Sequence, residues 1–450
     1  MPAKSVDLDP FGKPLSDESQ RLGSGWENDL MPMIHFLKVA AVRQCCVQPI
    51  PLSYDSDFNV FRWVLSAQRL HSNPEQEDAV ISLASANLSR HLRYRRALRL
   101  DEKRWPHWDE NPLHKERYMP RGAIVQGTTD NKNRLIWCIA YASMDIDGLL
   151  HKLRTSEYIL YQLWLCEHLL ELVMQQESRS HRLSGIHHLV DLDGFHVDPF
   201  AMLFVTGGTM GYLSNLLHYQ QYPELVQLNQ FVNCAGWLAI PYRVIKSVTP
   251  AGFGDRFKLH NGNYKSALLE EIDETALPQL FGGGADVPDV VPARKINEKE
   301  FYVNSPNRHQ FKENLLKLTI NPRRRKIIPV QASAQSKLSW HYTTDSDLYF
   351  GVFYSSGSEC AENNRKSSDT SNKCEEKGAE KQKKRQEKER LKELELDNLE
   401  MVYPYVRLGA KLVAEEDSIC CENAAVSLND KSLVVESDAA AKLRHRTFSV

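Results

Sequence analysis

Apolar residues recur with two different periods along the chain, and the change of period marks its main divisions. A short apolar run, LIWCIA, comes before a stretch at helical spacing that Thr155 caps and that ends near Met174, and a second apolar run, HHLVDL, follows. A strand, a helix and a second strand in this order form a βαβ unit. Such a unit places its two strands in parallel through a right-handed crossover. The pattern therefore predicts the start of an α/β sheet.

The same alternation continues beyond this unit. It predicts a helix opened by Asp198 and Pro199, the strand LNQFVNC, an apolar segment, the strand RFKLH and a helix that begins near Tyr264. Strands that are buried on both faces are typically continuous apolar runs of this kind. We expect all of these strands to form one largely buried sheet.

The region before this sheet is predicted to be helical. In SNPEQEDAV, Asn73 suits the N-cap, Pro74 the first helical position and Gln76 the capping-box partner of the N-cap. Acidic residues occupy the first turn of this helix and arginines its last turn, which complements the helix dipole. Residues 1–57 mix Pro, Ser and Asp without a sustained period, so we expect them to be a poorly ordered extension.

After residue 284 the period changes to strict alternation. The run LSWHYTTDSDLYFGVFY alternates apolar and polar residues on both sides of TDSD, which predicts a β-hairpin of a sandwich-type domain. Residues 356–396 are rich in Lys, Glu, Ser and Asn and poor in apolar residues. This composition predicts a solvent-exposed helix or a disordered insertion.

Composition narrows the class of protein. A chain of 450 residues with 42% hydrophobic content can build two or three domains. Its formal net charge of −2 gives no global field that would collect nucleic acid, so we expect no nucleic-acid partner. The N-terminus has no apolar signal core and no segment is long enough to span a bilayer, which favours a cytoplasmic protein. The nine cysteines form no C-x-x-C pair and are expected to be reduced and to bind no zinc.

Two motifs resemble functional sites, and we expect neither to act. In VDLDGFHVD the glycine, Gly194, stands at position four of the acidic loop, whereas a calcium-binding EF-hand needs glycine at position six, so we expect no metal. In FVTGGTMGYL the array Gly207, Thr209, Gly211 is similar to a hydrolase nucleophile elbow. That elbow normally carries Ser, and Asp255 and His260 complete a triad only by chain order. We therefore predict that the chain is not an enzyme.

The segment from Trp237 to Phe257 is too apolar for an ordinary surface loop and too broken by Pro and Gly to span a membrane. Ile240, Val244 and Val248 recur every fourth residue, which predicts a short helix with one apolar face. Such a helix is either an ordinary core helix of the α/β layer or a lid over an apolar pocket that can lie in a membrane interface.

These residues together resemble the CRAL-TRIO lipid-binding family. The resemblance rests on a Tyr222-Pro223-Glu224 corner, a strand that ends in Asn-Cys-Ala, the apolar helix, a strand with a basic start, the triplet Asn-Tyr-Lys, and Leu-Pro before Phe-Gly-Gly. Upstream, HLVDLDG resembles the central strand of the family, and FNVFRWVLSAQRL resembles its N-terminal helical subdomain. The resemblance covers residues 58 to about 284.

The following segments FYVNSPNRHQF, LSWHYTTDSDLYFGVFY and KLVAEEDSIC resemble the GOLD β-sandwich that follows this domain in supernatant protein factor and tocopherol-associated proteins. The charged insertion splits this match. Beyond Cys421 the sequence lacks the aromatic, Gly-containing closing strands of the family, so we expect either a tail or an atypical closing strand there.

The resemblance implies an apolar pocket that holds one lipid and assigns roles to particular residues. It implies a gate helix and its hinges over the pocket, and an acid and a base, Glu224 and Arg256, that contact a lipid headgroup. A further basic contact of the family is represented only by Arg69, which is displaced from the expected position. The gate residues are Tyr242, Arg243, Val244, Ile245, Lys246 and Val248, and the hinges are Pro250, Gly252 and Gly254.

The predicted fold class is α/β: an N-terminal helical subdomain and a CRAL-TRIO sheet, followed by a GOLD-like β-sandwich. We expect a lipid-transfer protein without a cofactor that binds one hydrophobic ligand, such as a phosphoinositide, tocopherol or squalene, and associates peripherally with intracellular membranes. The alternative is a lipid-regulated adaptor whose GOLD-like domain and charged insertion bind proteins. The predicted boundaries are 1–57 for the extension, 58–112 for the helical subdomain, 113–284 for the lipid-binding domain, 285–425 for the GOLD-like domain with its insertion at 356–396, and 426–450 for the tail or closing strand.

Overall fold

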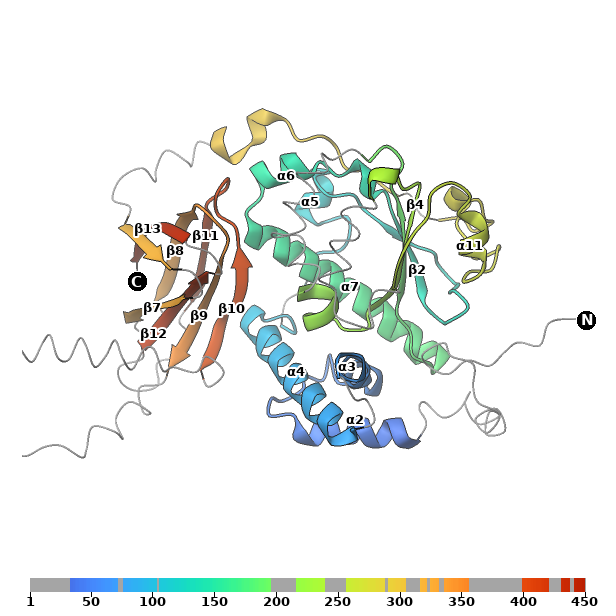
Figure 1. Cartoon of the computed structure of the whole chain (residues 1–450), viewed down its shortest axis with the longest axis horizontal. Coiled ribbons are helices and arrows are strands. Elements are labelled where there is room, and N and C mark those ends of the chain that lie inside the picture. Colours follow the sequence, from blue (N-terminus) through green and yellow to red (C-terminus); the bar gives the residue numbers. More distant parts are fainter. Residues whose placement is uncertain are drawn as a thin grey trace, which may run out of the picture. The chain divides into compact units, whose positions relative to one another are not determined.

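The computed structural model describes most of the chain and divides it into two compact units, which we describe separately (Figure 1). One unit contains the helical region and the α/β sheet, and the other contains residues 93–100, 153–156 and 302–450. No helix in the described part of the chain is both long enough and apolar enough to cross a membrane. The described residues are 33–71, 76–102, 105–195, 216–238, 256–287, 290–304, 316–321, 324–331, 336–355, 399–420, 430–437 and 441–449.

The N-terminal region is helical, as the sequence predicts, but it begins earlier than expected. Helix α2 covers Met33–Cys45, α3 covers Asp57–Leu70 and α4 covers Glu77–Leu98. The prediction that residues 1–57 form a poorly ordered extension is wrong from residue 33 onward, because α2 buries Val39 and Val42 in the core. The predicted caps Asn73 and Pro74 lie outside the described residues.

The predicted α/β sheet is present, with the strand order β1-β2-β3-β4-β5. Strand β1 is antiparallel to β2, and the strands from β2 to β5 are parallel, so the βαβ prediction is confirmed. Helix α7, Thr155–Ser180, is the crossover between β2 and β3. The strands are β1 Ala123–Ile124, β2 Leu135–Ile139, β3 Ile186–Asp191, β4 Val226–Val232 and β5 Phe257–Leu259.

Different elements cover the two faces of this sheet (Figure 1). On one face, Leu268 of α11 (Lys265–Leu269) and the nearby Ile272 pack in one core cluster with Ile136 of β2. On the other face, Leu172 of α7 and Leu135 of β2 line a common pocket. Neighbouring residues of a strand point to opposite faces, so each strand is covered on both sides. Short helices complete the domain at α5 Pro112–Lys115, α6 Ile146–Lys152, η2 Leu216–Gln221 and η5 Gln279–Phe281.

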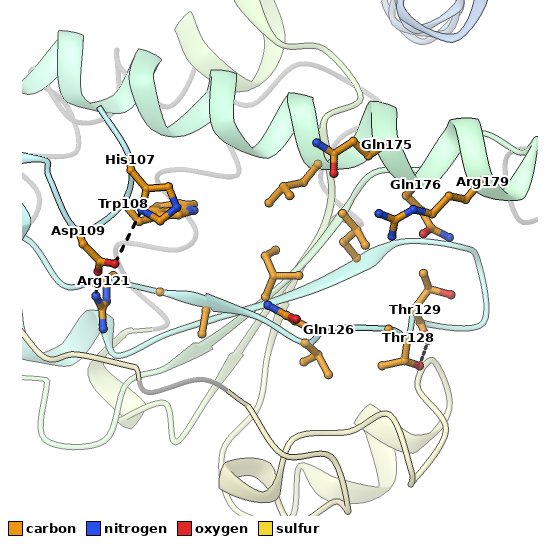
Figure 2. A pocket seen from close by; sticks show the side chains of 17 residues that line it. His107, Trp108, Asp109, Arg121, Gln126, Thr128, Thr129, Gln175, Gln176 and Arg179 are labelled. Carbon is orange, nitrogen blue, oxygen red and sulfur yellow. Dashed lines mark hydrogen bonds and ion pairs between the residues drawn. The ribbon is translucent and has the colours of Figure 1, made fainter. Parts of the chain in front are cut away.

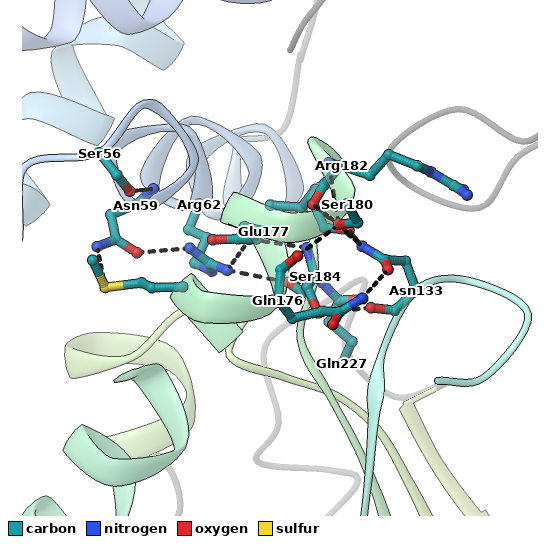
Figure 3. Close-up of polar contacts among 12 residues, drawn as sticks. Ser56, Asn59, Arg62, Asn133, Gln176, Glu177, Ser180, Arg182, Ser184 and Gln227 are labelled. Carbon is teal, nitrogen blue, oxygen red and sulfur yellow. Dashed lines mark hydrogen bonds and ion pairs between the residues drawn. The ribbon is translucent and has the colours of Figure 1, made fainter. Parts of the chain in front are cut away.

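A buried polar network attaches α3 to the connection between α7 and β3 (Figure 3). The Arg62 guanidinium donates to Glu177 at 2.5 Å and to the Ser184 carbonyl at 3.1 Å, and it also contacts Asn59. The Ser184 amide donates to the same Glu177 carboxylate at 2.9 Å. Charged groups are rarely buried without partners, and here the two charges pair with each other while Ser184 contacts both; among the described residues Nε of Arg62 has no hydrogen-bond partner.

The C-terminal unit contains two four-stranded antiparallel sheets, with the orders β10-β9-β12-β7 and β11-β8-β13-β6. Rings from the two sheets contact each other, since Trp340 of β8 lies 4.8 Å from Tyr403 of β10. The strands are β6 Leu316–Ile320, β7 Arg324–Gln331, β8 Lys337–Thr344, β9 Leu348–Ser355, β10 Glu400–Leu408, β11 Glu415–Cys420, β12 Asp430–Ser437 and β13 Ala441–Ser449.

The predicted hairpin is wrong, although both of its strands exist. Strand β8 pairs with β11 and β13, whereas β9 pairs with β10 and β12, so the TDSD turn joins two different sheets. The alternating apolar residues of β8 and β9 face each other instead of lying side by side, as the ring contact between Tyr342 and Phe350 at 5.1 Å shows. The last 25 residues supply β12 and β13, which are inner strands of the two sheets. The charged insertion lies outside the described residues.

Candidate functional site

The corner before β4 holds a carboxylate in an unusual backbone conformation. Tyr222 and Pro223 lead into Glu224, which has a φ of 61° and is only 2% exposed. A residue other than glycine or asparagine rarely adopts a positive φ, and such a conformation costs about 1–3 kcal/mol unless the surroundings impose it. The surroundings of Glu224 therefore determine where its carboxylate lies.

Two guanidinium groups hold this carboxylate. Arg256, which precedes β5, is hydrogen-bonded to Glu224 Oε2, and Arg69, from the last turn of α3, donates from Nε to Oε1 at 3.1 Å. The side chains of Glu224 and Arg256 are 3% and 7% exposed, but Arg69 is 35% exposed. One carboxylate and two guanidiniums leave one positive charge, and the most accessible part of it is on Arg69. We call Arg69, Glu224 and Arg256 the Glu224 cluster.

Neighbouring side chains fix the corner against the helices. The Tyr222 hydroxyl donates to Glu167 of α7 at 2.5 Å, and the His91 ring of α4 lies 2.9 Å from the Gln221 amide oxygen. The His91 ring also contacts the Tyr222 ring edge to face at 5.7 Å. These contacts explain how the strained conformation at Glu224 persists.

A row of side chains crosses the face of the sheet that α7 covers. Trp137, His188, Asn229 and Phe257 are register partners on four adjacent strands, so they share one face. The Trp137 and His188 rings stack at 4.5 Å, and His188 Nδ1 lies 3.1 Å from Asn229 Oδ1. This row gives the face an aromatic and weakly polar floor.

Both ends of the predicted gate segment are anchored to the sheet. Asn233, with a φ of 55°, donates to Asp191 at the end of β3 at 2.8 Å. The Cys234 amide donates to the His260 carbonyl at 3.0 Å, which connects the end of β4 to the end of β5. The segment between Leu238 and Arg256 lies outside the described residues. It contains every predicted gate and hinge residue, and the elbow residue Thr209 is likewise not described.

The opposite face of the sheet carries a chain of buried polar side chains. His187 lies between Asp130 and Gln230, with Nδ1 2.9 Å from the carboxylate and Nε2 3.0 Å from the amide nitrogen. The oxygen of the same amide lies 2.7 Å from Nε2 of His260. Burial lowers the pKa of His187. Burial opposes the charge of Asp130, but the hydrogen bond from His187 and the guanidinium of Arg134 hold its pKa below the ordinary value.

The structure brings the two predicted headgroup residues into direct contact and adds a third. Glu224 and Arg256 are 32 residues apart in sequence and are hydrogen-bonded. The sequence places Arg69 away from the position expected for the family, but in the structure Arg69 contacts Glu224. The signal that could have identified it is its position at the end of α3, where a long side chain can reach the corner before β4.

Two protein-family models match the regions that carry the Glu224 cluster, one at Arg69 and the other at Glu224 and Arg256. Residues 120–283 match the model of the CRAL/TRIO domain, so this part of the chain is a CRAL/TRIO domain. Residues 37–103 match a family described as a domain of unknown function, DUF8435. Neither match reaches the C-terminal sheets, and their GOLD-like assignment therefore stays a prediction.

Relatives and solved structures also show similarity to this chain, among them the following three. CRAL-TRIO domain-containing protein F28H7.8 of Caenorhabditis elegans is 22% identical over 343 residues, which are 75% of this chain and 80% of that protein. Phosphatidylinositol transfer protein SFH5 of Lodderomyces elongisporus is 24% identical over 133 residues, which are 28% of this chain and 29% of its own length. The crystal structure of Sfh5 aligns with a TM-score of 0.38 at 15% identity and covers 67% of this chain and 99% of that chain.

Proposed function

We propose that the CRAL/TRIO domain of this chain binds one lipid molecule and exchanges it at membrane surfaces, to which the protein binds peripherally. The observation that carries the proposal is the Glu224 cluster, a nearly buried ion pair with an additional, half-exposed guanidinium. A phosphate-containing headgroup such as that of phosphatidylinositol suits a cluster in which two guanidiniums share one carboxylate. The name of the SFH5 relative supports this choice of headgroup.

The acyl part of the ligand requires a cover that can open. Each buried methylene contributes ~0.8 kcal/mol, so withdrawing a sixteen-carbon chain into water costs about 13 kcal/mol. A pathway through water would therefore be too slow for useful exchange. The apolar segment after Leu238 supports a direct pathway, because its Val244, Ile245 and Val248 face can enter the membrane interface while the pocket opens. Pro250, Gly252 and Gly254 supply the hinge, since glycine adopts conformations closed to other residues.

The first experiment is mass spectrometry of an organic extract from the purified full-length protein. One equivalent of a lipid supports carriage. A protein that stays empty after incubation with liposomes, while remaining folded, contradicts it and favours the adaptor alternative. Exchange of a fluorescent phosphatidylinositol between vesicles then measures transfer directly.

Charge reversal separates the headgroup role of Arg256 from a structural one. We expect Arg256→Glu to abolish phosphatidylinositol binding and to spare a neutral isoprenoid, because two acids would then face the phosphate. Lys258→Glu is the matched control on the same strand, since Lys258 pairs with Glu271 at 3.1 Å and not with Glu224. Equal loss of both ligands in Arg256→Glu would show that Arg256 only maintains the fold.

The gate is tested by making its apolar face polar. We expect Val244→Asp combined with Val248→Asp to slow vesicle-to-vesicle transfer and weaken liposome binding far more than it lowers the melting temperature. Normal transfer by the folded double variant would mean that this segment is an ordinary core helix.

A further inference from the structure

A pocket of about 800 Å³ lies between α7 and the β1 edge of the five-stranded sheet. Its walls are the C-terminal half of α7, residues 121–129 and the segment 107–109. Glu224 and Arg256 of the Glu224 cluster precede β4 and β5, at the other end of the strand order. The volume is in the range of sites that hold small molecules, about 300–1,000 Å³.

The lining of the pocket changes from one end to the other (Figure 2). Trp108, Asp109 and Arg121 lie at one end, and Arg179, Gln176 and Thr128 lie at the other. Apolar side chains lie between these two ends, and the apolar residues that line the pocket include Ile124, Leu135 and Leu172. An apolar trough with polar ends fits an extended amphiphile, because the chain can lie over the middle while the head remains hydrated at an end.

Among the charged side chains that line the pocket, one cation is not paired with an acid that the structure describes. Arg121 forms an ion pair with Asp109, which neutralises both side chains. Arg179 is exposed, and its guanidinium makes no ion pair or hydrogen bond to any other residue that the structure describes. Two guanidiniums and one carboxylate therefore give the pocket one excess positive charge, located in the last turn of α7.

The wall of the pocket at Gly122 is bare backbone for a physical reason. A Cβ atom at this position would lie 2.2 Å from Nε1 of Trp137, so any larger residue would collide with the indole. The indole is 4% exposed, and within the described part of the chain its Nε1 has no hydrogen-bond partner. The pocket wall at Gly122 is therefore closely packed against the indole of Trp137.

We propose that this pocket is a second ligand site that binds one long-chain fatty acid, with its carboxylate at Arg179 and its acyl chain over Ile124, Leu135 and Leu172. A single carboxylate matches the single excess charge, whereas a phosphomonoester would bring close to two negative charges. Gln176 lies at the same end, and its amide donates one N–H to Asn133, which leaves its second N–H for a ligand. The partial negative charge at the C-terminal end of α7 opposes the carboxylate, which keeps the expected affinity near the micromolar level, about 8 kcal/mol.

The test measures oleate and oleyl alcohol binding to the full-length protein by calorimetry. We expect Arg179→Glu to weaken oleate binding about tenfold, as the loss of one charge-assisted contact predicts, and to leave oleyl alcohol binding unchanged. Arg179→Lys should restore most of the oleate affinity because it restores the charge. Arg182→Glu is the matched control, because Arg182 is an exposed cation of the following turn and does not line the pocket.

Further variants decide between this pocket and the site proposed above. Leu172→Trp, which fills the middle of the pocket, should remove oleate binding and leave phosphatidylinositol transfer unchanged, whereas Arg256→Glu should do the reverse. The proposal is overturned if the folded wild-type protein binds no oleate, if Arg179→Glu and Arg182→Glu weaken it equally, or if oleate binding is lost in Arg256→Glu and retained in Leu172→Trp.

Discussion

Helix α3 presents two arginines, and their different surroundings distinguish a buried ion pair from the proposed ligand site. Arg62 and Arg69 are two helical turns apart and contact Glu177 and Glu224 respectively. The Arg62 and Glu177 side chains are both 3% exposed, and the pair has no net charge. The Glu224 cluster has a second guanidinium and one half-exposed member. The same helix therefore holds the fold at one end and presents an excess cation at the other.

Burial dominates the Arg62–Glu177 pair. It raises the pKa of Glu177 even though the guanidinium lies 2.5 Å away, so the cost of removing the carboxylate from water exceeds the attraction. A pair of this kind contributes little net stability, yet removing one partner leaves an uncompensated charge. The Glu224 cluster, by contrast, contains two guanidiniums and one carboxylate, and its Arg69 side chain is partly exposed.

The largest expected effect on stability comes from removing one partner of the buried Arg62–Glu177 pair. We expect Glu177→Ala to lower the free energy of unfolding by about 3–5 kcal/mol, because Arg62 would remain buried and unpaired. The double variant Arg62→Met, Glu177→Leu should recover most of this loss, since neither charge remains. Urea unfolding measures both. A loss below about 1 kcal/mol in the single variant would show that water reaches the pair, and the contrast with the Glu224 cluster would disappear.

The second expected effect on stability concerns Glu224, the partner of Arg69 at the other end of α3. We expect Glu224→Gln to lower the free energy of unfolding by about 1–3 kcal/mol, less than Glu177→Ala, because the amide keeps its acceptor oxygen and Arg69 is partly hydrated. Glu224→Gly is the matched variant, because glycine adopts the observed φ of 61° without strain. If Glu224→Gly is as stable as the wild type, backbone strain offsets the whole contribution of the ion pairs.

The sequence predicts well those parts of the fold in which the apolar residues follow a single period and each strand has only one possible pairing partner. The apolar runs of β2 and β3 with α7 between them allow only a parallel pair, and that prediction is confirmed. The alternation in β8 and β9 predicts strands, but alternation does not say whether two buried faces lie in one sheet or oppose each other across two. That choice depends on partners 73 to 110 residues later in the chain, in β11, β12 and β13.

The candidate site, like the fold, is only partly predictable from the sequence. The motif around the corner before β4 identifies Glu224, and the basic start of β5 identifies Arg256. No local pattern identifies Arg69, because its contact spans 155 residues and depends on how α3 packs. Single side chains that approach from a distant element are the part of a site that periodicity does not reveal.

A third polar cluster lies on the sheet face that α11 covers. Unlike the two arginine clusters, it contains a histidine, His187, whose protonation can affect stability. Burial lowers the pKa of His187, so the folded protein keeps it neutral while the unfolded chain binds a proton below about pH 6.5. Stability should therefore be fully present above pH 6.5 and fall as the pH decreases toward the folded-state pKa, with a slope of at most about 1.4 kcal/mol per pH unit for this proton. His187→Gln should show a smaller slope between pH 7 and 5.5 in urea unfolding. Identical slopes would mean that the His187 proton is not linked to folding.

The smallest expected effect on stability comes from replacing Arg69. This variant is also the most direct test of whether the two arginines of α3 have different roles. Its side chain is 35% exposed, so Arg69→Gln should cost less than about 1 kcal/mol of unfolding free energy, as for other solvent-screened pairs. The excess charge of the Glu224 cluster disappears in this variant. We therefore expect the protein to bind phosphatidylinositol in vesicles about tenfold more weakly. We also expect this binding to depend less on the salt concentration. Arg90→Gln, an exposed arginine of α4, controls for the change in total charge. A large loss of stability with unchanged lipid binding would make Arg69 a structural residue like Arg62, and α3 would then serve the fold at both ends.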